Sequence, residues 1–203
     1  LHYESDTGIA TIAPASSGGT TSMIFRTNSG AGTSAESFRI NSSQNIALAN
    51  GHGIDFANFA HASGMSSELF DDYEEGTWTA TIIGSTSSPN SAQTTTGQYT
   101  KIGRLVFADA LFGGVDTTGA AGQIQVTGWP YNSNTTIPTG NVMFQNIVTI
   151  RTDAGNIAPF WSNSTVLNFY QALHGTNIWV ALEHNAGVAS ANLYLSVTYI
   201  TAS

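Results

Sequence analysis

The clearest pattern of hydrophobic and polar positions lies near the end of the chain, in the stretch "LYLSVTYI". Leu193, Leu195, Val197 and Tyr199 occupy alternate positions there. Successive side chains of a strand point to opposite faces of a sheet, so this period of two predicts a β-strand with one face on a core.

Stretches of the same kind recur from Gly76 onward, and aromatic residues are frequent in them. The segments between them are rich in Gly, Ser, Asn and Pro, which favour turns. Strands with turn signals at roughly every 8–12 residues are typical of a β-sandwich, and eight of them favour a jelly roll. We therefore predict a β-sandwich, jelly-roll-like head domain over residues 77–203. The eight stretches are GTWTATIIG, GQYTKIG, RLVFADALFGG, GQIQVTGW, NVMFQNIVTI, TVLNFYQAL, NIWVALEHN and ANLYLSVTYITA.

The first part of the chain, residues 1–64, has a different texture. Its apolar runs, such as "SMIFRT" and "NIALANG", are short, about 4–6 residues each, at the low end of strand length. Few large side chains occur in it, so one copy could not bury enough apolar area to offset the entropy lost on ordering. We predict a short-stranded fibre shaft segment in which three identical chains share one interior. The chain is then an obligate, intertwined homotrimer.

Composition supports the all-β class. Ser, Thr, Asn and Gly together fill 85 of the 203 positions, and only 9% of residues are charged, far below the usual level of about 25%. The frequent Thr, Val, Ile and aromatic residues favour strands, while strong helix formers are scarce. The surface is therefore expected to be wetted by hydroxyl and amide groups.

Charge and cysteine content exclude several classes of protein. The net charge is −8 and the five basic residues are scattered, which argues against a nucleic-acid partner. The absence of cysteine excludes disulfides, zinc–thiolate sites and a cysteine nucleophile. No apolar run approaches about 18 residues, so no membrane insertion is expected. The first residues lack a signal-peptide pattern and read as the middle of a domain, so we expect a piece of a longer chain.

Four segments of the chain, taken together, form a pattern that is seen in a known protein family. The chain contains "DDYEEGTWTATIIG", then "GQYTKIGRLV", then "VTGWPYN", and it closes on "LYLSVTYI". In this combination it resembles the C-terminal head of bacteriophage tail-fibre proteins, especially those of aquatic phages. Upstream, "ESFRINSSQNIALANGHGIDF" resembles the shaft repeats that often precede that head. The similarity is good over roughly residues 20–110 and loose elsewhere.

The resemblance implies a trimeric fibre tip on the virion, outside the cell, that touches the host surface. Its partners would be two identical chains, a host surface glycan or protein, and other virion tail proteins at the N-terminal end. Many fibres of this kind end in a self-cleaving chaperone domain; nothing follows Ser203 here to show one, so we expect that it is absent or has been removed.

The segment "ELFDDYEE" holds five of the thirteen acidic residues within eight positions. We interpret residues 65–76 as a solvated acidic connector. A short helix capped by Ser66 or Ser67 would also fit, although Glu74 and Glu75 would then lie at the unfavourable end of the helix dipole. Two chemical interpretations stay open beside these: a Ca²⁺ site, which three copies of the carboxylates would favour, and a catalytic carboxylate pair. Among the histidines, His52 is the best placed to share a metal with its symmetry mates, but an ordinary turn histidine is the preferred interpretation.

Two loops of the predicted head combine aromatic rings with amides and hydroxyls, in "GWPYNSN" and "APFWSNS". Sugars have one apolar face and a rim of hydroxyls, so such loops suit a glycan, and aromatic residues also dominate protein interfaces. For Trp129 and Trp161 a place in the core is nevertheless the preferred interpretation, ahead of receptor contact, and Trp78 and Trp179 are expected in the core as well. The candidate receptor-binding residues are Trp129, Tyr131, Asn132, Asn134, Phe160, Trp161 and Asn163.

The sequence therefore favours attachment to a host surface receptor as a homotrimer. The first alternative is a purely structural trimerisation or capping module of a virion appendage. The second is a capsule-degrading enzyme, for which 203 residues leave little room. No nucleophile elbow, phosphate-binding loop or dinucleotide fingerprint is present, so we expect no enzyme, no catalytic residue, no cofactor and no metal.

Overall fold

The computed structural model of the chain describes most of its second half and separate stretches of its first. The chain divides into two compact units, Leu1–Asp71 and Asp72–Ser203, called here the first and second unit. The residues described are 2–4, 9–11, 22–28, 34–56, 63, 69–70, 72–134, 137, 140–163, 165–185 and 187–202.

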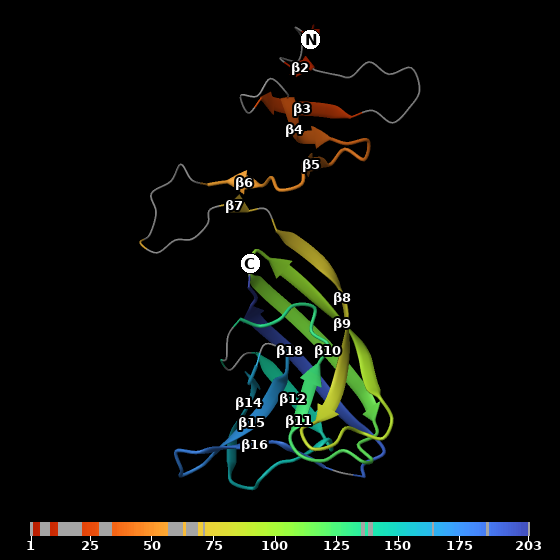
Figure 1. The fold of residues 1–203 in the computed structure, drawn as a ribbon, viewed down its shortest axis with the longest axis vertical. Coiled ribbons are helices and arrows are strands. Elements are labelled where there is room, and N and C mark those ends of the chain that lie inside the picture. The colour runs from red at the N-terminus through yellow and green to blue at the C-terminus, as the bar shows by residue number, and fades with distance from the viewer. Residues whose placement is uncertain are drawn as a thin grey trace. The chain divides into compact units, whose positions relative to one another are not determined.

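The first unit consists of short antiparallel strands (Figure 1). They form three small sheets, in which β1 pairs with β2, β4 lies between β3 and β5, and β6 pairs with β7. A stacked pair of rings, Phe25 on Phe38 with centroids 4.2 Å apart, joins β3 to β4. The strands are β1 (His2–Glu4), β2 (Ile9–Thr11), β3 (Met23–Asn28), β4 (Ser34–Ile40), β5 (Ile46–Leu48), β6 (Ile54–Asp55) and β7 (Leu69–Phe70).

The second unit is built on one sheet of nine strands, ordered β12-β18-β10-β9-β8-β11-β15-β14, with β16 also paired to β15. The end strands β12 and β14 are in contact, so the sheet curls into a nearly closed, barrel-like arrangement (Figure 1). The strands of this unit are β8 (Tyr73–Gly84), β9 (Gln93–Ile102), β10 (Leu105–Val115), β11 (Ile124–Thr127), β12 (Asn141–Gln145), β13 (Val148–Thr149), β14 (Ala154–Trp161), β15 (Leu167–Leu173), β16 (Trp179–Ala181), β17 (Glu183–His184) and β18 (Ala191–Ile200). Strands β13 and β17 form a separate pair.

Alternation along each strand produces the core of this unit. On β18, Leu193, Leu195, Val197 and Tyr199 are all buried, which confirms the face predicted from the sequence. Strands β8, β10, β11, β14 and β15 contribute alternate residues in the same way. The largest fully buried side chains are Trp161, Tyr199, Phe169, Ile82, Ile124, Ile147, Leu167, Leu182 and Leu193.

The all-β prediction is confirmed, since the described residues contain strands and no helix. In particular, no helix among them could cross a membrane. The sequence predicted a sandwich of the jelly-roll type, and the hydrogen bonding instead joins nine strands of the second unit into one continuous curled sheet.

Strand β8 begins at Tyr73, inside the segment interpreted as a connector. Its first residues pair with the end of β9, Tyr73 opposite Ile102 and Gly76 opposite Tyr99. Residues 73–76 are therefore the start of the first strand of the second unit. The proposed helix cap at Ser66 or Ser67 lies outside the described residues, as do Glu68 and Asp71.

Candidate functional site

The two aromatic loops picked out in the sequence do converge, but Trp161 belongs to the core and Trp129 is partly buried against it. The rings of Trp129 and Trp161 meet edge to face at 4.9 Å, and Trp129 stacks on Trp78 at 4.4 Å. The Trp129 indole Nε1 donates to the carbonyl oxygen of Val126 at 3.0 Å. Trp161 is 0% exposed. Alternation along β14 turns Trp161 inward, so the interpretation of Trp161 as a core residue is confirmed and its candidacy as a receptor contact is wrong.

The other candidates of these loops have different roles. Tyr131 is half-buried, and Asn132 and Asn134 are exposed. The side-chain oxygen of Asn163 accepts hydrogen bonds from the backbone N–H groups of Thr165 and Val166, both at 2.9 Å, so this amide fixes a turn.

Phe160, the neighbour of Trp161, points to the outer face of the sheet, where two more rings meet it. Its ring centroid lies 5.7 Å from Tyr170 and 5.9 Å from Trp179, and the last two are 5.8 Å apart. Trp179 is 64% exposed. The expectation that Trp179 belongs to the core is wrong: in β16 and just after it, Leu182 is buried while Trp179 and Ala181 occupy alternate positions on the opposite face. We call Phe160, Tyr170 and Trp179 the ring cluster.

The described carboxylates of the acidic segment are each held by a partner. Glu74 accepts hydrogen bonds from the hydroxyls of Tyr131 and Tyr99, and these bonds lower the pKa of Glu74. The same contact with Glu74 raises the pKa of both tyrosines. Glu75 accepts from the Tyr73 hydroxyl. Because tyrosines donate to Glu74 and Glu75, this end of β8 forms a network of hydrogen bonds.

Asp72 pairs with Lys101, whose side chain is almost fully buried. The ammonium of Lys101 also lies 5.3 Å from the centre of the Tyr131 ring. A buried cation needs such partners, because burial of an isolated charge is costly. Within the described ranges no group of three or more His, Asp or Glu side chains could hold a metal ion.

The described histidines do not gather into a site that could hold a metal ion. His52 and His174 are exposed, whereas His184 is buried. His184 Nε2 donates to the carbonyl oxygen of Ile83 at 3.2 Å, and burial lowers the pKa of His184. The side chains of His2 and His61 lie outside the described part of the chain.

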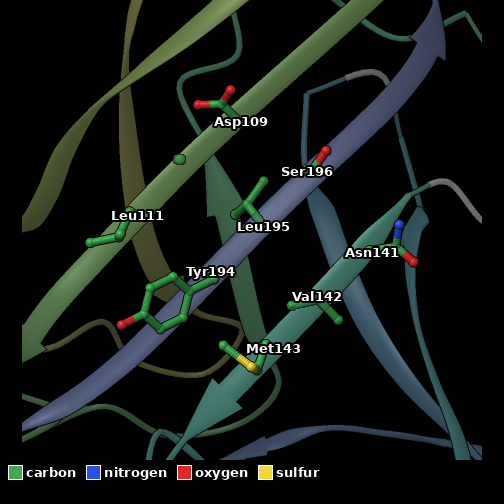
Figure 2. A pocket seen from close by; sticks show the side chains of 9 residues that line it. Asp109, Leu111, Asn141, Val142, Met143, Tyr194, Leu195 and Ser196 are labelled. Atoms are coloured by element: carbon green, nitrogen blue, oxygen red, sulfur yellow. The ribbon is translucent and has the colours of Figure 1, made fainter.

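A second apolar surface lies on the outer face of the curled sheet, over β10, β18 and β12. Leu111, Tyr194 and Met143 are directly opposite one another in the register and form a row across the three strands (Figure 2). The next row is polar, Asp109, Ser196 and Asn141. The two rows line a hollow of about 380 Å³. Leu105, Phe107 and Ile102 extend the exposed apolar surface along β10 and β9.

No protein-family model matches the chain, and no curated protein sequence is similar to it.

Sequence reasoning missed two features of the surface, the ring cluster and the row across β10, β18 and β12. The signal for the first was present in "NIWVALEHN", where Trp179 and Ala181 alternate with Val180 and Leu182. When both alternating sets of side chains on a strand are apolar, the sequence does not indicate which set faces the core. The second depends on strand order, which joins residues far apart in sequence.

Proposed function

We propose that the chain is the C-terminal part of a bacteriophage tail fibre, a homotrimeric fibre tip that attaches the virion to a glycan or protein on the host surface. In this proposal residues 1–64 form a shaft segment shared by three chains. The second unit is the head, with opposite parts of its curled sheet packed across one interior as the two sheets of a sandwich are.

The observation that carries the proposal is the burial pattern of the first unit. None of its described side chains, within residues 22–27, 34–56, 63 and 69–70, is buried. Its larger apolar residues are instead exposed, Ile46 by 70%. Exposed apolar surface on this scale is typical of an interaction surface. The exposed residues of this kind are Ile24, Phe25, Ile40, Ile46, Leu48, Ile54, Phe56, Leu69 and Phe70.

The outer surface of the head supports the same proposal. The row of Leu111, Tyr194 and Met143 leaves apolar side chains in solvent on one copy, and a neighbouring copy would cover them. Three copies on one axis also place three receptor contacts on one rigid tip, so a weak contact per chain is strengthened by multivalency.

Mass in solution and labelling of cells test the proposal together. Light scattering is expected to give three times the 21.3 kDa of one chain, and fluorescently labelled protein is expected to bind candidate bacterial hosts. A compact, well-ordered monomer at low concentration would overturn the proposal. A trimer that labels no host would instead favour the alternative, a structural module of a virion appendage. Release of reducing ends from host polysaccharide would favour the enzyme.

A further inference from the structure

The ring cluster is unusual because three aromatic side chains from three neighbouring strands gather on the solvent face of a sheet. Phe160 comes from β14, Tyr170 from β15 and Trp179 from β16. All three pairs of ring centroids lie 5.7–5.9 Å apart. At these distances the rings support one another. The indole of Trp179 is thus held in place while most of its surface remains in water.

The neighbours of the rings are small. Across the strands, Ala158 and Ala181 lie opposite Tyr170, and Ala172 lies opposite Trp179. A hollow of about 600 Å³ opens beside Trp179 and is lined by Ala172, Thr176, Asn177, Ile178 and Trp179. This volume lies within the usual range of about 300–1,000 Å³ for small-ligand sites.

The rim of this hollow is polar and uncharged. Thr176 and Asn177 are exposed, and Asn156 is exposed opposite Ala172. In the part of the chain that is described, the side-chain amides of Asn156 and Asn177 are not engaged in a hydrogen bond. None of the residues that line the hollow is charged. The arrangement is therefore an apolar plate with amide and hydroxyl groups at its edge.

We infer that the ring cluster is a binding site for a neutral pyranose, with the C–H face of the sugar on Trp179 and its hydroxyls at the Thr176–Asn177 rim. This inference rests on the proposed function and gives it a specific contact. The uncharged rim favours a neutral sugar over a uronic or sialic acid. A few residues around one hollow form a small patch, whereas a stable protein interface covers about 800 Å² on each partner. A saccharide is thus the occupant that fits.

Tryptophan fluorescence offers a direct test, because the other three indoles, Trp78, Trp129 and Trp161, lie in or against the core. Acrylamide should quench Trp179 selectively in the full chain. The probes are methyl pyranosides of glucose, galactose and mannose, their disaccharides, and glucuronate and sialic acid as charged controls. At least one neutral saccharide is expected to protect Trp179 from quenching, and the charged controls are not.

Substitutions distinguish the site from the rest of the head. Trp179→Ala should weaken binding of the protecting saccharide about tenfold or more, measured by calorimetry, as is usual for an aromatic hot spot. Trp179→Phe keeps a flat ring and should retain most of the affinity. Tyr73→Ala, a control at another exposed aromatic position, should bind normally. Unchanged mass and thermal midpoint establish that each variant is folded.

The outcomes separate this inference from the proposed function. Absence of protection by every neutral saccharide, or protection by the charged controls alone, overturns the inference. On a host that the wild type labels, equal labelling by Trp179→Ala overturns the role of the ring cluster as the host contact, while attachment itself stands. Saccharide binding that depends on Trp179 supports the site even if no host is labelled, and in that case the proposed function fails.

Discussion

The indole of Trp78 lies opposite Gly97 in the β8–β9 register, and its Nε1 donates a hydrogen bond to the carbonyl oxygen of Asp109 at 3.1 Å. A Cβ atom on Gly97 would collide with both the indole and that carbonyl oxygen. The contact therefore joins three adjacent strands at a point where only glycine fits.

Gly97→Ala is expected to destabilise the second unit by about 3 kcal/mol, because the indole must move and its hydrogen bond is lost. Denaturant unfolding measures the change. Gly113→Ala is a matched control on β10, since a Cβ there would meet its nearest atoms at an ordinary 3.7 Å. A Gly97→Ala variant as stable as Gly113→Ala would contradict the packing described for Trp78.

The core tryptophan and the surface tryptophan should differ sharply in their contribution to stability. Trp161→Ala removes a fully buried ring and is expected to cost about 3–5 kcal/mol. Trp179→Ala removes a ring that is mostly in solvent and should cost less than about 1 kcal/mol. Thermal or denaturant unfolding of the two variants measures both losses. A larger loss of stability for Trp179→Ala than for Trp161→Ala would mean that the buried and exposed faces are assigned the wrong way round.

Glu74 should make the second unit sensitive to acid. Because Tyr131 and Tyr99 lower its pKa, the unfolded chain takes up a proton near the ordinary value of 4.5 while the folded chain does so only at lower pH. The stabilisation is complete above 4.5 and is lost as the pH falls through the lowered pKa. Glu74→Gln should therefore flatten the dependence of unfolding free energy on pH in this range.

One further variant, a double substitution, checks whether these hydrogen bonds cause the pH dependence. Removing both donors, in Tyr99→Phe with Tyr131→Phe, should flatten the same part of the curve. A slope retained in both Glu74→Gln and the double variant would mean that other carboxylates produce it.

His184 should affect the pH dependence of stability at higher pH than Glu74 does. Burial lowers its pKa, so as the pH falls below the ordinary value of 6.5 the unfolded chain binds a proton before the folded one. Stability is complete above 6.5 and declines as the pH falls toward the lowered pKa. His184→Gln should abolish this decline, whereas His174→Gln, at an exposed position, should retain it. Equal curves for the two variants would remove His184 as the cause.

The ordered structure of the first unit should depend on the protein concentration. If its apolar side chains are covered only by other copies, dilution should release them before the second unit unfolds. Amide hydrogen exchange of the full chain is expected to speed up with dilution within residues 22–56 and to stay slow in β8, β10 and β18. Slow exchange in both units at every concentration would contradict the shared interior.

Alternation allowed much of the second unit to be predicted from sequence. The inward face of β18 and the burial of Trp78 are as expected. The error over Trp179 has a simple origin: the period of two separates two sets of residues on a strand without saying which set is inside. That choice depends on which strands lie alongside, and β16 lies beside β15 through pairing that the sequence does not display.

The acidic segment illustrates a second limit of prediction from sequence, the contacts between residues that are far apart along the chain. Its carboxylates were easy to see, but their partners come from distant positions, Lys101 and Tyr99 on β9 and Tyr131 after β11. The pairing of β8 with β9 on one side and with β11 on the other brings these groups together. Composition predicted a shortage of core side chains in residues 1–64, which needs no knowledge of strand order, and none of the side chains described there is buried.

The contact between β12 and β14 bears on how other molecules can attach. A sheet that nearly closes on itself leaves little backbone at its ends for an incoming strand. Strand addition, by which many extended peptides and amyloid-prone segments recruit a sheet, is therefore disfavoured. If the second unit recognises another molecule as proposed, side chains on the outside of its curled sheet would make the contact, and surface substitutions would alter specificity without disturbing the backbone beneath.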